Sequence, residues 1–430
     1  MTKTVEKVLG LLTFALILIL GNTLLATDML FFRLLIGVGF GYTLARAYTG
    51  FAGSVNRAYR TGSTQLMRAM IFMFFITSVM IMGFLFNSDP TNYSLWINPI
   101  NLGLLLGAFL FGFGMSLSVC CATGVLTDLT MGFTRALITL IFFGIGVFLG
   151  FPIQRTAGWV TNSWITSPTG AEFSGGVFLP DLFKWDGFQG YLGAILLLGL
   201  FSSIVIFASY QYEKKRRKEN TYFGVPSEKE QESRKKLDLF NFKLFSQETY
   251  DHIFVKPWTL TEGAVVLSIL FVLLFGVTKA GWGASTPHGV FIGKILMVFG
   301  VSGETIAEFT KMPVSTFTTP FFQNASLVQN FGIVVGALAY LLSAGKFVES
   351  FKSELRVTGK EAFLYALGGI LMGFGTRFAN GCNVGALYSP IVEFSLSGWI
   401  FLAFMVLGAV VSNKIFYKIP SKTEFKVDKN

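Results

Sequence analysis

The stretch GFGMSLSVCCATG, from Gly112 to Gly124, recurs downstream as GFGTRFANGCNVG, from Gly373 to Gly385. One constant offset of 261 residues aligns the two copies. Glycine lets backbones approach closely, whereas a segment such as Gly-Cys-Asn-Val-Gly is a poor helix interior. The pattern therefore predicts two copies of one structural unit, each ending in a turn that carries a cysteine. The matched pairs are Gly107 with Gly368, Gly112 with Gly373, Gly114 with Gly375, Cys121 with Cys382, and Gly124 with Gly385.

The composition is typical of a polytopic membrane protein. Of the 430 residues, 52% are hydrophobic and 13% are charged, and the mean hydropathy is +0.60, far from the balance of a soluble domain. The net charge of +10 comes from basic residues that cluster between apolar segments. Such clustering indicates membrane topology and contact with anionic lipid. The expected partner is therefore the lipid bilayer and not nucleic acid.

The three cysteines predict neither a disulfide framework nor a metal site. Cys120, Cys121 and Cys382 cannot all pair, and none has the spacing of a structural zinc site. The segment GVFIGKI, residues 289–295, is too short for a phosphate-binding loop and lacks Ser or Thr after its lysine. We therefore expect no metal, no nucleotide and no other cofactor.

Apolar segments long enough to cross a bilayer occur about ten times. A helical span needs roughly 20 mostly apolar residues, and somewhat fewer where the helix is buried in protein. The predicted spans cover residues 8–26, 29–45, 67–86, 101–119, 133–152, 188–210, 259–278, 326–345, 362–380 and 396–417.

The distribution of lysine and arginine predicts the orientation of these spans. Segments rich in basic residues are expected to be cytoplasmic, and the segments 87–99 and 151–186, which are poor in them, to be external. This assignment alternates across ten spans, so both termini of a multi-pass cell-membrane protein are expected in the cytoplasm. Span 101–119 then runs inward and span 362–380 outward. The basic segments include Lys3 and Lys7 and residues 46–68, 214–256, 346–360 and 414–429.

Inverted repeats of this kind are typical of transporters, because they place two gates around one site near the midplane. The predicted fold is thus an all-α polytopic membrane protein with two inverted-topology repeats, each with a broken or re-entrant helix carrying a Gly-Cys motif. Residues 1–28 form an extra N-terminal transmembrane helix, and residues 29–210 form the first repeat with a connecting helix. Residues 211–257 form a cytoplasmic polar linker, and residues 258–430 form the second repeat and a short cytoplasmic tail.

These motifs are similar to those of the YeeE/YedE family of membrane transporters. The resemblance rests on GFG followed after six residues by Cys-x-x-Gly in both halves, and it extends over nearly all of residues 29–415. It is also carried by the stretches LLIGVGFGYTLARAYTGFAGSVNRAYRTG and LLFGVTKAGWGASTPHGVFIGKILMVFGVSG. The resemblance implies import of thiosulfate, or of a related sulfur- or selenium-containing anion, along a cysteine-lined path.

The chain departs from the family pattern at two positions. Where family members commonly carry a further cysteine this chain has Gly50, and near another such position it has Ser285. Only the cysteines at 121 and 382 carry over from the family. The resemblance therefore does not determine which sulfur- or selenium-containing anion is the substrate, nor does it establish a relay of three or more thiols.

The predicted substrate pathway centres on the repeated cysteines. A neutral thiol is a weak, polarizable donor suited to the soft terminal sulfur of thiosulfate, whereas a thiolate would repel the dianion. Cys121 and Cys382 are expected to act on the substrate, and Cys120, whose counterpart is Gly381, to matter less. Gly124 and Gly385 would open the half-helix N-termini, whose N–H groups favour anions.

Three polar residues of the second motif complete the predicted path. Arg377 lies inside an apolar span, five residues before Cys382, and is expected to attract the anion, with a structural ion pair or snorkelling as the alternative. Asn380 and Asn383 flank the same cysteine and could donate amide hydrogen bonds or cap a broken helix.

Two other classes of function remain open on the sequence. One is a membrane-embedded sulfur-transfer enzyme or accessory subunit that uses a cysteine persulfide, which needs an exposed thiol beside a base or cation. The other is a scaffold whose linker binds a soluble sulfur-carrier protein on the cytoplasmic side. Transport without enzyme activity is the prediction.

Overall fold

The computed structural model describes residues 2–233, 243, 246–353 and 355–417. This part of the chain is built from helices, and its β-structure is confined to two isolated bridges, Ser94 with Ala280 and Phe178 with Ser395. The prediction of an all-α polytopic membrane protein is confirmed.

Within the described residues, nine helices are long and apolar enough to cross a membrane, two of them continuing into shorter segments. The remaining predicted span, 101–119, is α5 (Leu102–Ser118), an apolar helix of 17 residues. Every predicted span thus coincides with a helix. The nine are α1 (Lys3–Leu24), α2 (Asp28–Ala47), α4 (Gln65–Leu85), α7 (Phe133–Thr156), α10 (Tyr191–Lys218), α13 (Leu260–Thr278), α17 (Ala325–Ser343), α19 (Gly359–Phe378) and α21 (Leu396–Phe416).

Shorter helices lie between the long ones. Two of them matter for the site: α3 (Ala52–Thr61) and α14 (Thr286–Val298), neither of which belongs to the ten predicted spans. Two more follow the cysteines, α6 (Gly124–Asp128) and the π-helix η5 (Asn383–Tyr388), which continues into α20 (Ser389–Val392). The others are η1 (Pro90–Asn92), α8 (Gly158–Thr161), α9 (Pro168–Ala171), η2 (Leu179–Phe183), α11 (Pro226–Glu232), α12 (Gln247–Tyr250), η3 (Asp251–Val255), α15 (Gly303–Thr310), α16 (Ser315–Thr318), η4 (Phe321–Gln323) and α18 (Phe347–Ser353).

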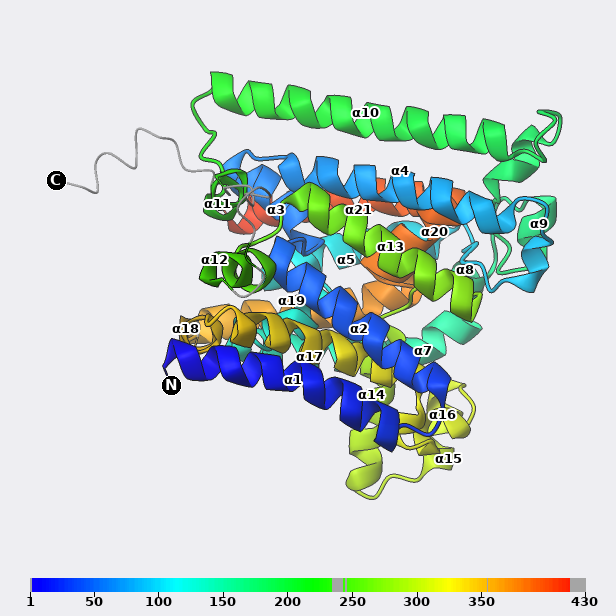
Figure 1. Cartoon of the computed structure of the whole chain (residues 1–430). Coiled ribbons are helices and arrows are strands. Elements are labelled where there is room, and N and C mark those ends of the chain that lie inside the picture. Colours follow the sequence, from blue (N-terminus) through cyan, green and yellow to red (C-terminus); the bar gives the residue numbers. More distant parts are fainter. Residues whose placement is uncertain (1, 234–242, 244–245, 354, 418–430) are drawn as a thin grey trace.

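The long helices form one bundle with two distinct ends (Figure 1). One end holds the start of α1 together with α11, α12 and α18, and we term it the inner end. The opposite end holds α8, α9, α15 and α16, and we term it the outer end. The described parts of the segments predicted to be cytoplasmic gather at the inner end, and the segments predicted to be external, 87–99 and 151–186, gather at the outer end.

The centre of the bundle is the crossing of α5 and α19, which is made by glycines. A Cβ atom at Gly107 would lie 2.7 Å from the carbonyl oxygen of Gly375, and one at Gly114 would lie 2.5 Å from that of Gly368. Close helix crossings of this kind require small residues. The upstream glycines of both motifs therefore serve helix packing.

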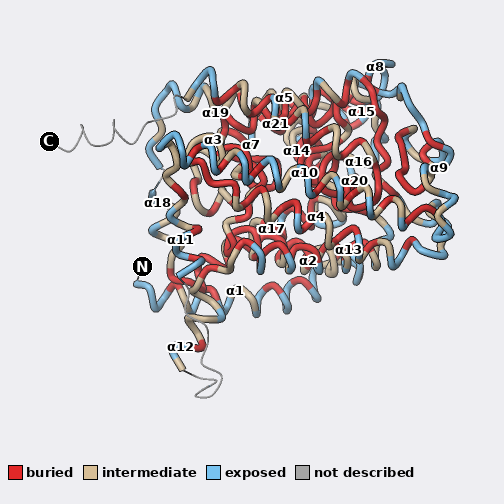
Figure 2. Tube along the Cα trace, turned by 90° about the horizontal axis from the view of Figure 1, so that it is seen from above, coloured by how far each residue is buried: buried red, intermediate tan, exposed pale blue. Residues whose placement is uncertain are grey.

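The main contacts between long helices join the first half of the chain to the second. Helix α2 packs on α17, α4 packs on α13, α7 packs on α19, and α5 packs on α21. Figure 2 shows that burial is concentrated in the middle of the bundle, while α1 remains largely exposed at its edge.

The expectation of a solvated linker is wrong for several described residues of segment 211–257. The first part continues α10 to Lys218, and α11 docks on the inner end. Ser63 Oγ donates to Glu228 Oε2 at 2.5 Å, and Gln231 Nε2 donates to the Ala47 carbonyl oxygen at 2.8 Å. Both Glu228 and Gln231 are buried, because these contacts satisfy their polar groups. The middle of the linker, 234–242, lies outside the described residues.

Single-cysteine labelling should reproduce the division into inner and outer ends. In a background without native cysteines, we expect Lys215→Cys and Lys352→Cys to be protected from an impermeant reagent added outside intact cells. Ser174→Cys and Thr91→Cys should react, since all four positions are exposed in the fold. Reaction of position 215 from outside would contradict the predicted orientation of the spans.

Candidate anion vestibule and cysteine turns

The first cysteine turn follows α5 directly. The chain leaves the helix through Val119, which has φ 59°, and then passes Cys120 and Cys121 before α6 begins. Left-handed backbone is uncommon for valine and requires support from its surroundings. The backbone N–H of Gly124 donates to the sulfur of Cys121 at 3.3 Å, and Thr123 Oγ1 lies 3.5 Å from it. The thiol therefore sits at the start of a short helix.

The second cysteine turn has the same construction. The chain leaves α19 through Asn380, which has φ 58°, and passes Gly381 and Cys382 before η5 begins. The two thiols thus occupy equivalent places, three residues before Gly124 and Gly385.

All three cysteines are free and buried. Cys121 and Cys382 have no exposed surface, and Cys120 is 2% exposed. A Cβ atom at Gly381 would lie only 2.4 Å from the carbonyl carbon of Gly385 and would clash with it. Close packing therefore requires glycine at this position. No cluster of metal-ligating side chains is present in the described part of the chain.

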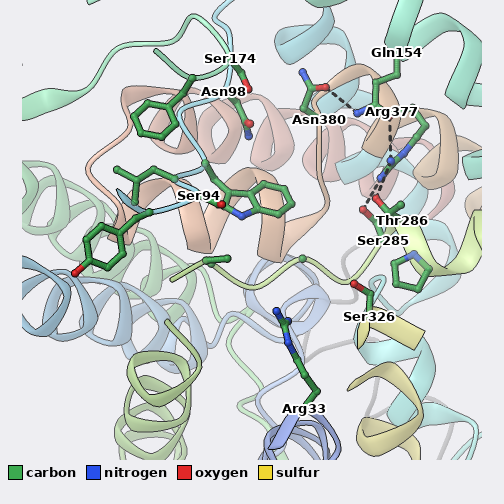
Figure 3. A pocket seen from close by; sticks show the side chains of 18 residues that line it. Arg33, Ser94, Asn98, Gln154, Ser174, Ser285, Thr286, Ser326, Arg377 and Asn380 are labelled. Atoms are coloured by element: carbon green, nitrogen blue, oxygen red, sulfur yellow. Dashed lines mark hydrogen bonds between the residues drawn. The ribbon is translucent and has the colours of Figure 1, made fainter. Parts of the chain in front are cut away.

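A cavity of about 760 Å³ opens at the outer end of the bundle, and we term it the vestibule. Among its described lining residues the only charged side chains are Arg33 and Arg377, and none is acidic. Figure 3 shows the two arginines reaching toward the vestibule from different sides. Cationic and amide groups without carboxylates favour an anion in this space. Its polar lining residues are Arg33, Tyr93, Ser94, Trp96, Asn98, Gln154, Ser174, Ser285, Thr286, Ser326, Arg377 and Asn380.

Arg377 is held in the vestibule wall by neutral groups. Its guanidinium donates to Gln154 Oε1 and Thr286 Oγ1, both at 3.1 Å, and to Ser285 Oγ at 2.6 Å. The side chain is 3% exposed, and no carboxylate in the described residues forms an ion pair with it. A buried cation without a counter-ion is expensive, so an arriving anion would be stabilised here. The alternative that Arg377 forms a structural ion pair therefore has no support among the described residues.

Arg33, in α2, was not identified from the sequence. It donates to Gln329 Oε1 at 2.9 Å, while its Nε is buried without a hydrogen-bond partner. A charged residue within the predicted span 29–45 was the available signal. The vestibule therefore has a second cation on the wall opposite α19.

Asn380 belongs to the vestibule, whereas Asn383 does not line it. Asn380 Oδ1 accepts from Gln154 Nε2 at 2.8 Å, which connects the Arg377 network to the turn. Asn383 Nδ2 contacts the sulfur of Met115 at 3.2 Å, and its Oδ1 is buried without a partner. Asn383 thus ties the second turn to α5.

Trp96 separates the vestibule from the turn of Cys382. Its indole lines the cavity and lies against Gly385, where a Cβ atom would be 2.6 Å from the ring. Asn98 Nδ2 donates to the carbonyl oxygen of Gly385 at 3.2 Å. The indole therefore lies between the vestibule and the turn at Gly385.

The two departures from the family pattern, Gly50 and Ser285, each lie just before a short helix. Ser285, which precedes α14, contacts Arg377 in the vestibule. Gly50, which precedes α3, has no atom within 4 Å of the position where a Cβ atom would stand. A larger side chain would fit at residue 50, while at residue 285 a hydroxyl serves as an acceptor for the guanidinium.

The family described as sulphur transport matches residues 46–411 of the chain. The chain belongs to this family. The resemblance to YeeE/YedE transporters is thereby confirmed, as is the expectation of a transporter and not an enzyme.

Several curated relatives are named as transporters. The thiosulfate transporter TsuA of Spirochaeta thermophila is 25% identical over 390 residues, which is 88% of this chain and 97% of that protein. A protein of Salmonella typhimurium named "Probable transporter YedE" is 26% identical over 175 residues, 40% of this chain. That match spans 42% of the YedE protein. TsuA of Escherichia coli is 34% identical over 103 residues, 21% of this chain and 29% of that protein.

Proposed function

We propose that this member of the sulphur transport family imports thiosulfate, or a closely related sulfur-containing anion, through the vestibule and past Cys382 and Cys121. The observation that carries the proposal is a vestibule beside the turn of Cys382 whose described lining residues include two arginines and no acid. Guanidinium groups recognise oxyanions through several parallel donors. The relatives named as thiosulfate transporters support this substrate class.

The two thiols suit the other end of the substrate. Thiosulfate presents three oxygens and one terminal sulfur, a large soft atom. A neutral buried thiol donates weakly to such an atom without adding negative charge to the path. In this arrangement Arg377 and Arg33 would bind the oxygens of thiosulfate. Its terminal sulfur would point toward the thiol in the Cys382 turn.

An inverted repeat is part of this proposal. Exchanging the halves by 261 residues converts the Gly107–Gly375 contact into the Gly114–Gly368 contact, as a two-fold axis requires. The same exchange matches the left-handed residues Val119 and Asn380. Passage would then occur between the two cysteine turns, with one turn gating each end.

The alternative of a sulfur-transfer enzyme lacks an observation in its favour. A persulfide-forming cysteine needs an accessible thiol beside a base or cation, whereas all three thiols are buried. Binding of a soluble sulfur-carrier protein, and the cytoplasmic location of the inner end, stay predictions.

Uptake of labelled thiosulfate tests the proposed function. We expect cells that lack other uptake routes to accumulate the label when they express this chain. Unlabelled thiosulfate should compete strongly, sulfate weakly, and sulfite and selenite to degrees that define the substrate class. Expression without any gain in uptake, with the protein present in the membrane, would contradict the proposal.

A further inference from the structure

Glu393 is a buried acid that the proposed binding site does not use. It lies between α20 and α21 and has no exposed surface. The backbone N–H of Trp96 donates to its Oε2 at 2.5 Å, whereas its Oε1 is buried without a hydrogen-bond partner. Acids at such positions in membrane proteins are costly and commonly mark pathways for ions or protons.

Glu393 lies directly behind the vestibule wall. Trp96 and Gly281 both line the vestibule, and both touch this carboxyl group. A Cβ atom at Gly281 would collide with Oε1 of Glu393, so only glycine lets the wall approach so closely. A small displacement of this wall would connect the acid to the vestibule.

The surroundings of Glu393 do not compensate a negative charge. None of the charged or titratable side chains on neighbouring elements, nor either vestibule arginine, forms a hydrogen bond or ion pair with it in the described structure. Ionisation would leave a buried carboxylate with a single hydrogen bond, whereas protonation removes the charge. The titratable side chains on the segments next to Glu393 are those of Tyr93, Asp181, Tyr191, Lys279 and Tyr388.

We propose that Glu393 is a proton-binding site that couples the entry of a proton to the passage of the anion. An ionised Glu393 would repel an anion in the vestibule, so occupancy of the vestibule and protonation of Glu393 favour each other. This coupling is reciprocal by thermodynamic necessity. The inference rests on the proposed function, and it specifies symport of the sulfur-containing anion with at least one proton.

Trp96 gives this coupling a structural route. The same residue covers Gly385 with its indole and holds Glu393 with its backbone N–H. An ionised carboxylate is the stronger acceptor, so it would hold this segment in place. Protonation would weaken that hydrogen bond and release the indole from the Cys382 turn.

Uptake by proteoliposomes under a pH gradient tests the inference. With the external side one pH unit more acidic than the lumen, wild-type protein is expected to take up labelled thiosulfate about 3- to 10-fold faster than at equal pH, since one proton site responds at most ~10-fold per pH unit. Glu393→Gln should retain downhill uptake and lose the response to the gradient. Glu304→Gln, which alters an exposed acid of α15, is the matched control and should respond as wild type.

Each outcome separates the two proposals. A gradient response in Glu393→Gln equal to that of wild type would overturn the proton site and leave thiosulfate import intact. Absence of downhill uptake by wild-type protein would instead overturn the proposed function. Should Glu393→Gln fail to fold, proton uptake by detergent-solubilised wild-type protein on addition of thiosulfate decides. Titrations between pH 5.5 and 8.5 are expected to show a maximum of uptake, with at most one proton per bound anion. No uptake at any of these pH values would overturn the inference.

Discussion

Replacing Arg377 with glutamine is expected to raise the half-saturating thiosulfate concentration by about 10- to 100-fold. The guanidinium is 3% exposed, and no described carboxylate pairs with it. Hydrogen bonds to charged groups contribute about 1.5–3 kcal/mol each, and ~1.4 kcal/mol corresponds to tenfold in affinity. Loss of the charge should therefore weaken anion capture and leave the neutral Gln154 and Ser285 in place.

Initial uptake rates, normalised to the folded protein recovered by size-exclusion chromatography, measure this effect. Arg377→Lys is expected to recover part of the loss, because a point charge remains while the forked donor geometry is gone. Arg155→Gln removes an exposed cation from the end of α7 and serves as the control. Unchanged affinity in Arg377→Gln would remove this residue from the pathway.

Cys382→Ala and Cys121→Ala are each expected to lower uptake by about tenfold without reducing insertion in the membrane. Both thiols are fully buried at the starts of equivalent short helices, and each would lose a contact to the passing anion at a constriction. A neutral hydrogen bond contributes about 0.5–1.5 kcal/mol. The upper end of this range corresponds to the expected tenfold loss of uptake.

Cys120→Ala is the matched comparison for the two thiol variants. Cys120 is adjacent to Cys121 and also buried, but its counterpart in the second half is Gly381. We expect a loss of less than threefold. Wild-type rates in both Cys121→Ala and Cys382→Ala would mean that the thiols only fill space.

The spans were predictable because burial in lipid demands long apolar helices. The segment 101–119 was recognised although α5 is only 17 residues long, because a span that is buried in protein can be shorter than one that faces lipid. Helix α14 has only 13 residues, so the length criterion for a span did not identify it. Ser285 and Pro287, a serine just before the helix and a proline in its first turn, were the available signal for its start.

The cysteine turns were predictable from the repeated sequence motif, and the vestibule was not. The offset of 261 located Cys121 and Cys382, and the apolar context singled out Arg377. Trp96 and Glu393 lie 297 residues apart, and nothing in the local sequence of either indicates that they touch. Such contacts arise from tertiary packing, which periodicity and spacing do not encode.

The most direct measurement of the central claim is uptake of labelled thiosulfate by proteoliposomes that contain this chain as their only protein. Saturable uptake that excess unlabelled thiosulfate abolishes and excess sulfate does not is the expected result, and Arg377→Gln should shift its saturation to higher concentration. Uptake no faster than in protein-free liposomes, from protein that elutes as a folded species, would contradict the proposal that this chain alone forms the thiosulfate pathway.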